Sequence, residues 1–294
     1  MNTALDRVTV IVVTFNSAHC IAPLAEGLRT APHVVVVDNA SADDTAAAVA
    51  RELSQAQWLP QPRNLGFGAA NNLGVTHAAT EFVLLLNPDC VLQPGAIEAL
   101  VAAADRFPDA ACIAPQLLDR GGQPDLSHRW RSDRWASRGP GAEGPACVGF
   151  ATGACLLIRT DAMRRIGGFD EGFFLYYEDD DLCIRLQQQC GALVFEPAAR
   201  VQHISRGSVG GPVRRQAEYL RGYHHIQSKF RFRAKHLGAS TALPRRLGYA
   251  VVAALEGVLR LLLLDPRRAW RCFGRVAGVL AYAPAPLSAS RSSS

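Results

Sequence analysis

The sequence has no pair of cysteines separated by two residues, and its eight cysteines are scattered singly over 294 residues. A zinc ribbon needs such pairs and a disulfide scaffold needs a far higher cysteine density, so both classes are excluded. The pattern instead predicts reduced, mostly buried thiols in a cytoplasmic protein. We also expect no secretory leader, because the first apolar run, residues 8–15, is short and is followed by no cleavage site.

Two common nucleotide-binding signatures are missing as well. The chain contains no GxxxxGK[ST] segment, which excludes a P-loop nucleotide hydrolase. Residues 64–74, NLGFGAANNLG, contain a GxG but no GxGxxG, and no acidic strand end follows at the spacing that a dinucleotide site requires. Any nucleotide chemistry must therefore rest on other residues.

Acidic residues are scarce in the last third of the chain. Residues 1–203 hold 15 Lys and Arg against 23 Asp and Glu, whereas residues 204–294 hold 16 against 3. A basic tail on an acidic body favours a separate anionic partner for the tail, either a membrane surface or a nucleic acid. The tail has no helix-turn-helix and no aromatic-rich RNA-binding motif, so nucleic acid is the weaker alternative and we expect none to bind.

No apolar run is long enough to span a bilayer without interruption. The longest candidate, residues 248–264, has about 17 residues and contains Glu256 and Arg260, which lie one helical turn apart and can pair. Arginines on both sides suit an amphipathic helix lying on anionic lipid. The alternative is a buried helix that packs within the fold.

The first part of the chain alternates apolar strands with helical patterns. Continuous apolar strands predict an α/β fold with a mostly parallel central sheet covered by helices on both faces. The strands are expected at 8–15, 33–41 and 81–92, and the helices at 17–30, 41–55 and 67–79, with Ser17 and Ser41 as caps. Residues 119–147 are rich in Gly, Pro, Ser and Arg and predict a long surface loop.

Polar residues follow each of these three strands: Thr14–Asn16, Asp38–Ser41 and Asn87–Asp89. Ligands bind at the carboxyl ends of the strands in such sheets. Asp38 can either cap the next helix or bind the base and a ribose hydroxyl of a nucleotide. The Asn87–Asp89 segment can hold a divalent cation together with substrate phosphate, or simply form a turn.

The densest acidic cluster is Glu178–Asp181, four carboxylates in a row at the start of a predicted helix. Stabilisation of the helix dipole is one explanation. Crowded carboxylates also raise one another's pKa, which can tune one of them as a general base, with Arg185 orienting the group. His203 ends a further strand and can be a metal ligand, a base or an ordinary surface histidine.

Taken in order, six segments resemble glycosyltransferase family 2, and in particular its rhamnosyltransferase-like members. The similarity spans about 200 residues at consistent spacing. The segments are VIVVTFNS (10–17), VVVVDNASADDT (34–45), NLGFGAANNLG (64–74), LLLNPDCVL (84–92), residues 153–186 and VQH (201–203). Residues 224–238 also resemble a stretch typical of the rhamnosyltransferase-like members.

The resemblance implies a GT-A fold and an inverting transfer from a nucleoside-diphosphate sugar. Asp179 matches the catalytic base, supported by Glu178, Asp181 and Arg185. The matches to the nucleotide-sugar site are Thr14, Asn16, Asp38, Asn39, Asn64, Gly68 and Asn87. Asp89 and His203 match the ligands of Mg²⁺ or Mn²⁺, although Asn87 replaces the first Asp of the DXD motif. Gly153, Trp130 and Trp135 are expected to border the acceptor.

The resemblance also implies how the chain is organised. Residues 1–210 form the transferase domain (1–92 for the nucleotide sugar, 93–210 for the acceptor and catalysis), 211–283 a basic helical segment that contacts the membrane surface, and 284–294 a disordered tail.

Partners and location follow from the same resemblance. The expected donor is dTDP-L-rhamnose, ahead of UDP-GlcNAc, UDP-galactose or galactofuranose, and GDP-mannose. The expected acceptor is a glycan or a polyprenyl-diphosphate-linked sugar in cell-envelope polysaccharide synthesis. The protein is then cytoplasmic and peripheral on the inner face of the cell membrane, and the sequence leaves a homo-oligomer open.

Two other functional classes stay open. A sugar nucleotidyltransferase is disfavoured, because the segment after the first strand is TFNSAHC and not a glycine-rich basic loop. A non-catalytic nucleotide-sugar binder is disfavoured by the joint presence of Asp89, Asp179 and His203.

Overall fold

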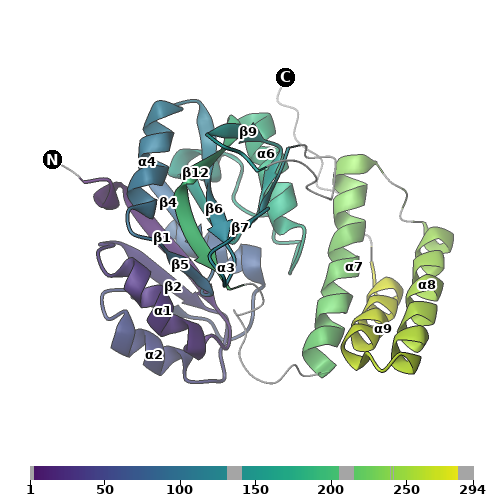
Figure 1. Ribbon diagram of the computed structural model, residues 1–294. Helices are drawn as coiled ribbons and strands as arrows, with labels where there is room; N and C mark the ends of the chain where they lie inside the picture. The colour runs from purple at the N-terminus through teal and green to yellow at the C-terminus, as the bar shows by residue number, and fades with distance from the viewer. Residues whose placement is uncertain (1–2, 131–140, 205–214, 239, 241, 284–294) are drawn as a thin grey trace. The chain divides into compact units, whose positions relative to one another are not determined.

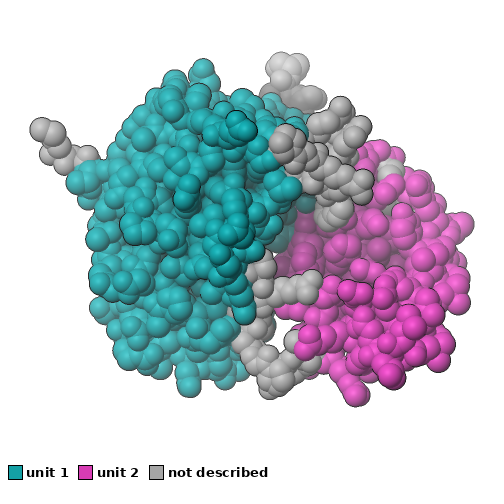
Figure 2. Space-filling view, viewed as in Figure 1, with its two compact units in different colours: residues 1–171, 178–210 teal, residues 172–177, 211–294 magenta. Residues whose placement is uncertain are grey.

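The computed structural model describes the chain except residues 1–2, 131–140, 205–214, 239, 241 and 284–294. The chain divides into two compact units (Figure 2). Unit 1 contains residues 1–171 and 178–210, and unit 2 contains residues 172–177 and 211–294. The chain therefore leaves unit 1 after residue 171 and returns to it at residue 178.

The first half of unit 1 is a parallel sheet with the strand order β3-β2-β1-β4. Figure 1 labels β1, β2 and β4 of this sheet. After the short helix η1 (Leu5–Arg7), its strands are β1 (Val8–Thr14), β2 (Val34–Asp38), β3 (Gln57–Pro60) and β4 (Phe82–Leu86). The helices between them are α1 (Ala18–Leu28), α2 (Thr45–Glu52) and α3 (Phe67–Thr76). Consecutive register pairs such as Thr14 with Asp38 bring the carboxyl ends of β1 and β2 together.

The second half of unit 1 continues the same sheet with mixed strand directions. Strands β11 and β4 pair antiparallel, as do β11 and β6, whereas β12 runs parallel to β6 and antiparallel to β5. The main strands are β5 (Cys90–Leu92), β6 (Ala110–Leu118), β11 (Cys155–Arg159) and β12 (Ala192–His203). The helices are α4 (Ala96–Arg106), α5 (Thr160–Arg165) and α6 (Glu178–Gln189). Short strands complete the half: β7 (Pro124–Asp125), β8 (His128–Arg129), β9 (Ala146–Val148) and β10 (Phe150–Ala151).

Both faces of the central sheet are covered, as the apolar strands predict. Every residue of β1, β2 and β4 is buried. Alternate residues of β1 enter different cores: Val10 and Val12 pack in one cluster and Ile11 in another. A strand without an exposed face needs no polar alternation, which explains why these runs are continuously hydrophobic.

Three details of the expected secondary structure were wrong. The strand expected at 81–92 is two strands, β4 and β5, separated by a turn that contains Asn87 and Asp89. Helix α2 begins at Thr45 rather than at Ser41, because the Ser41 hydroxyl oxygen accepts from the Asn16 N–H over 2.8 Å and not from a helical N–H. The expected loop 119–147 contains β7, β8 and the start of β9, and His128 and Arg129 are buried.

The described residues of unit 2 form three helices: α7 (Arg215–Leu237), α8 (Leu243–Leu262) and α9 (Pro266–Leu280). Its core includes Ile226, Phe230 and Val279. Glu218 on α7 is buried and pairs with Arg271 on α9. Within the part of the chain that is described, no helix is long and apolar enough to cross a membrane. The expected functional division at residue 210 stays a prediction, and the tail 284–294 lies outside the described residues.

Candidate active site

The carboxyl ends of β1 and β2 form a connected polar group. Thr14 Oγ1 donates to Asp38 Oδ1 over 2.8 Å, and the Ser41 backbone N–H donates to Asp38 Oδ2 over 2.9 Å. Asn16, which adopts a positive φ of 52°, accepts from the Ala42 backbone N–H over 2.8 Å. These bonds fix the strand-end loops against each other, as expected of a pocket that recognises a polar ligand.

Asn39 ties the same edge to the loop before α3. Its side chain donates to the carbonyl of Gly66 over 3.1 Å and accepts from the Leu65 N–H over 3.2 Å. Asn64 accepts from the Gly66 N–H over 2.9 Å. Gly68 is buried in the first turn of α3, where an added Cβ would lie 2.8 Å from the Cβ of Phe169. The structure thus places Gly68 in a packing contact.

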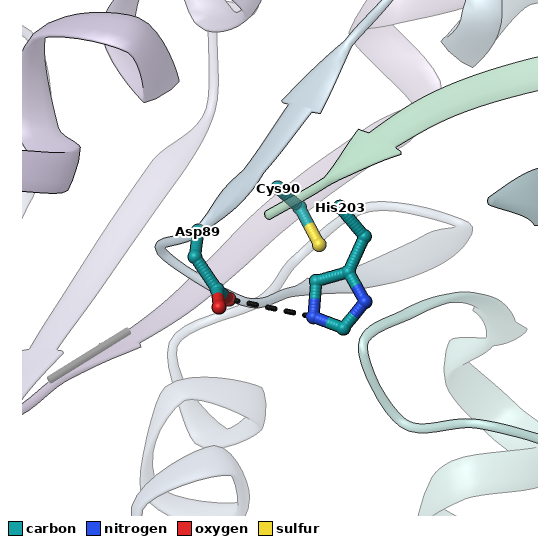
Figure 3. Close-up of side chains that lie close together, drawn as sticks. All are labelled: Asp89, Cys90 and His203. Carbon is teal, nitrogen blue, oxygen red and sulfur yellow. Dashed lines mark ion pairs between the residues drawn. The ribbon is translucent and has the colours of Figure 1, made fainter. Parts of the chain in front are cut away.

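The turn between β4 and β5 places Asp89 beside His203 (Figure 3). Strand β12 pairs with β5 so that His203 lies opposite Cys90, and the Ile204 N–H donates to the Asp89 carbonyl over 2.9 Å. His203 Nε2 lies 3.7 Å from Asp89 Oδ1. Residues more than a hundred positions apart in the chain are therefore brought together, as the resemblance implies.

The donor atoms of this group fit a divalent cation. One ligand atom from each of Asp89, Cys90 and His203 lies within 4.8 Å of the others. Two atoms bound to one ion at about 2.1 Å each are at most about 4.2 Å apart, and the carboxylate and imidazole atoms satisfy that limit. The Cys90 thiol is buried and donates to the carbonyl of Ala154 over 3.4 Å. Oxygen and nitrogen ligands suit Mg²⁺ or Mn²⁺ better than a thiol does.

The four carboxylates at the start of α6 have different surroundings. Asp179 is half-buried, and its Oδ2 accepts from the backbone N–H of Gly153 over 3.2 Å. Burial raises the pKa of the Asp179 carboxyl to about 6, and the negative charge of Asp180 adds to the rise. Its Oδ1 accepts from the backbone N–H of Asp180 over 3.0 Å. A carboxylate with a pKa near neutrality, held by two backbone N–H groups and, among the described residues, by no cationic side chain, is suited to accept a proton.

The next two carboxylates of α6, Asp180 and Asp181, each pair with an arginine. Asp180 forms a buried ion pair with Arg129, whose guanidinium also lies 3.8 Å from the centroid of the Phe150 ring. Asp181 pairs with Arg185 at 2.7 Å, and Arg185 also donates to the carbonyls of Ile166 and Gly168. These contacts tie the start of α6 to β8 and to the residues after α5.

Glu178 is buried, and its Oε2 has no hydrogen-bond partner among the described residues. Burial, and then the charge of Asp179, raises the pKa of Glu178 well above its ordinary value, which favours the neutral form of the group.

Residues 153–154 lie between Asp179 and the candidate metal site formed by Asp89, Cys90 and His203. The Ala154 carbonyl accepts from the Asn87 N–H over 2.9 Å and from the Cys90 thiol, while the Gly153 N–H binds Asp179. The β4–β5 turn and the start of α6 therefore border the same two residues.

Sequence reasoning missed Arg129. Its only signal was an arginine in a loop-like segment, with no local hint of its partner. Trp130, expected near the acceptor, is 38% exposed and lies edge-on to the buried His128. Trp135 lies outside the described residues. The acceptor roles of Trp130 and Gly153 stay predictions.

Comparisons with known proteins agree with this architecture. The structure is similar to a mannosyltransferase from Pyrobaculum calidifontis solved with GDP-Man and Mn²⁺, with a TM-score of 0.59, 19% identity, and coverage of 93% of this chain and 87% of that one. It is also similar to GalNAc-T7 solved with UDP, GalNAc and Mn²⁺, with a TM-score of 0.60, 16% identity, and coverage of 78% and 47%. The fold is thus of the GT-A type.

The chain belongs to glycosyltransferase family 2, because the model of that family matches residues 9–167. One curated relative is an N-acetylglucosaminyl-diphospho-decaprenol L-rhamnosyltransferase of Mycobacterium tuberculosis, 30% identical over 256 residues, which cover 74% of this chain and 82% of the relative. Another is a low-salt glycan biosynthesis hexosyltransferase of Haloferax volcanii, 28% identical over 198 residues and covering 64% of each chain.

Proposed function

We propose that this protein is an inverting glycosyltransferase that transfers L-rhamnose from dTDP-L-rhamnose to a sugar hydroxyl on a polyprenyl diphosphate. The observation that carries the reaction type is the carboxylate of Asp179, which has a pKa of about 6 and accepts from the backbone N–H groups of Gly153 and Asp180. The activity for which the M. tuberculosis relative is named supports both the donor and the acceptor class.

In the proposed mechanism, Asp179 accepts the proton of the acceptor hydroxyl as that oxygen attacks the anomeric carbon of the donor. The attack comes from the face opposite the leaving diphosphate, so the configuration at that carbon inverts. Asp180 and Asp181, each held by an arginine, keep the start of α6 in place during this step. Thr14, Asn16, Asp38, Asn39, Asn64 and Asn87 are proposed to bind the nucleotide sugar.

Asp89 and His203 are the residues that would hold Mg²⁺ or Mn²⁺. When bound, such an ion acts as a Lewis acid that neutralises charge on the leaving diphosphate. Only two protein ligands are offered by carboxylate and imidazole, which leaves coordination positions for phosphate oxygens and water, as Mg²⁺ prefers.

The experiment that tests this proposal is a donor panel. The wild-type protein is incubated with dTDP-L-rhamnose, UDP-GlcNAc, UDP-galactose and GDP-mannose, each with Mn²⁺ and with EDTA, and with GlcNAc-diphospho-polyprenol as acceptor. We expect transfer from dTDP-L-rhamnose alone, stimulated by metal, with a product of inverted anomeric configuration. Transfer from another donor would show that the transferred sugar is not L-rhamnose. Binding of a donor without any transfer would favour a non-catalytic nucleotide-sugar binder.

We further propose that α8 contacts an anionic membrane surface on the cytoplasmic side. A stripe at one-turn spacing on α8 is exposed: Leu247 at 42%, Val251 at 58%, Leu255 at 67%, Leu259 at 54% and Leu262 at 75%. Exposed apolar area of this extent on an amphipathic helix is typical of interfacial helices.

The charges beside the stripe support a lipid partner. Arg245, Arg267 and Arg268 are exposed, whereas the one acid of α8, Glu256, is occupied by Arg260 and Arg275 at 3.6 Å each. Glu256 with Arg260 is the pair that the sequence predicts.

Co-sedimentation with phosphatidylglycerol and with phosphatidylcholine vesicles tests the contact. We expect binding to the anionic vesicles only, and its loss in the double variant Leu255→Glu, Leu259→Glu. The control is Leu126→Glu, which changes an exposed leucine of unit 1. Equal binding by all three proteins would refute the proposal.

A further inference from the structure

The segment Gly172–Tyr177 belongs structurally to unit 2, although unit 1 contains the residues on both sides of it. It has the sequence GFFLYY and is followed directly by Glu178 and Asp179 at the start of α6. We call it the aromatic segment. Both this segment and α7 belong to unit 2, so the contacts between them lie within that unit.

Three side chains of α7 hold the middle and the end of the aromatic segment. The Ser228 hydroxyl, which is buried, donates to the carbonyl of Leu175 over 2.9 Å. The ring of Phe174 stacks on His224 with 4.2 Å between centroids. The ring centroid of Tyr177 lies 5.2 Å from that of Phe232.

The side chain of Arg231 contacts the start of the aromatic segment. The guanidinium of Arg231 lies 5.4 Å from the centroid of the Phe173 ring. A Cβ at Gly172 would lie only 2.0 Å from Arg231 Cζ, so a side chain is incompatible with this approach. His224, Ser228 and Arg231 follow one another at spacings of three and four residues and so share one face of α7.

The aromatic segment ends in an unusual backbone conformation. Tyr176 has a φ of 70° and Tyr177 a φ of 67°, in the left-handed region that aromatic residues rarely occupy. Such conformations are unfavourable and persist only where surrounding contacts enforce them. The contacts with α7 supply that enforcement, and the next residue along the chain begins α6.

We propose that Ser228 and Phe232 of α7 are positioning residues, which hold the aromatic segment and thereby fix the start of α6 so that Asp179 stays on the Gly153 N–H. The link to Asp179 is the backbone itself, because Tyr177 is only two residues before it. The stretch 224–238, which contains both residues, then has the role of holding the aromatic segment. It rests on the proposed function in so far as Asp179 is the base.

Hydrogen exchange tests the positioning without any activity assay. The Gly153 and Asp180 amides donate to the two carboxylate oxygens of Asp179, over 3.2 Å and 3.0 Å, so their exchange rates report on its position. We expect Ser228→Ala and Phe232→Leu to accelerate both amides at least about tenfold relative to wild type, because each variant removes one contact that holds the segment.

The matched control is Phe230→Leu. Phe230 lies on the same helix and is also buried, but its ring contacts Tyr249 and Tyr282, at 5.5 Å and 5.3 Å. We expect wild-type exchange at both amides in this variant. Equal acceleration in Phe230→Leu would overturn the proposal, because it would show general loosening of unit 2. Wild-type exchange in Ser228→Ala and Phe232→Leu would overturn it as well.

Kinetics with dTDP-L-rhamnose provide a second, separable test. We expect Ser228→Ala to lower kcat about 10- to 100-fold, because small misplacements of reacting groups cost that much. We also expect KM for the donor within twofold of wild type, and an acidic limb of the kcat profile at lower pH, since a displaced Asp179 is better hydrated. Ser228→Thr, which keeps the hydroxyl, should restore kcat.

The two proposals fail in different ways. A wild-type protein that transfers no sugar from any donor contradicts the proposed function, while the hydrogen-exchange result still decides the positioning role. An active wild-type protein whose Ser228→Ala variant has unchanged kcat and an unchanged pH limb contradicts the positioning role alone.

Discussion

Replacing Asp179 with Asn removes the proposed base while keeping its shape. The amide oxygen of Asn can still accept from the Gly153 N–H, whereas its NH2 group cannot accept from the Asp180 N–H, so one of the two hydrogen bonds is retained. Loss of a positioned general base costs typically about 10²- to 10⁴-fold in rate. We therefore expect kcat to fall by that factor while the thermal stabilisation by dTDP-L-rhamnose stays at the wild-type value.

The same substitution has a calculable effect on stability. The pKa of Asp179 rises from its ordinary 3.8 to about 6 in the folded protein. Keeping this carboxyl ionised in the fold therefore costs on the order of 3 kcal/mol, a cost fully present above pH 6 and absent below pH 3.8. The Asp179→Asn variant carries no such cost, so it should be more stable than wild type at pH 7.5, by at most several degrees in Tm. The gain should shrink as the pH falls through 6.

The wild-type rate should follow the ionisation of the same group. With a pKa of about 6, Asp179 is about nine-tenths ionised at pH 7 and about one-tenth at pH 5, so kcat should fall about tenfold per pH unit at the acidic end. The assays are initial rates and thermal melts from pH 5 to 8. An Asp179→Asn variant that turns over normally, or that melts below wild type at pH 7.5, would refute this account of Asp179.

Three further substitutions test other parts of the site. Asp89→Ala should abolish the stimulation of donor binding by Mn²⁺, measured by titration calorimetry with and without EDTA. Asp180→Asn removes the charge that raises the pKa of Asp179, so the acidic limb of the rate profile should move to lower pH. Gly68→Ala forces a contact of 2.8 Å with Phe169 and should destabilise the protein by about 1–3 kcal/mol in urea unfolding.

Each of these has a contrary outcome. Donor affinity that responds equally to Mn²⁺ in the Asp89 variant would exclude that carboxylate as a ligand. For the pH limb, Asp181→Asn is the control, because Asp181 lies on the same turn of α6 and is paired with Arg185. If both variants shift the limb equally, general loosening of α6 is the cause. A Gly68→Ala variant with wild-type stability would mean that Phe169 moves aside freely.

The predictable part of the fold was the part with strong local signals. Strands β1, β2 and β4 are continuous apolar runs, and the polar residues after them mark the carboxyl edge of the sheet. The GT-A fold and the family are confirmed. The start of α2 was missed because a tertiary hydrogen bond decides it. The Ser41 hydroxyl oxygen accepts from the N–H of Asn16, 25 positions away, and Asp43 accepts from the Thr45 N–H instead.

The segment 119–147 shows why composition alone misled. Its glycines and prolines indicate a loop, yet Arg129 is buried because it pairs with Asp180, 51 positions away. A buried arginine is tolerated only with such a partner, and no local pattern reveals a partner at that distance. The same holds for the aromatic segment, whose membership in unit 2 depends on α7.

The run Glu178–Asp181 shows most clearly what three dimensions add. The sequence offers four equivalent acids and cannot choose among them. In the fold, Asp180 and Asp181 are each paired with an arginine, and burial raises the pKa of Glu178 well above its ordinary value, which favours its neutral form. Asp179 is held by the backbone N–H groups of Gly153 and Asp180, and its pKa rises to about 6. A run of four acids can therefore place one ionisable base at the site without concentrating four negative charges beside a diphosphate substrate, whose own charge would be repelled.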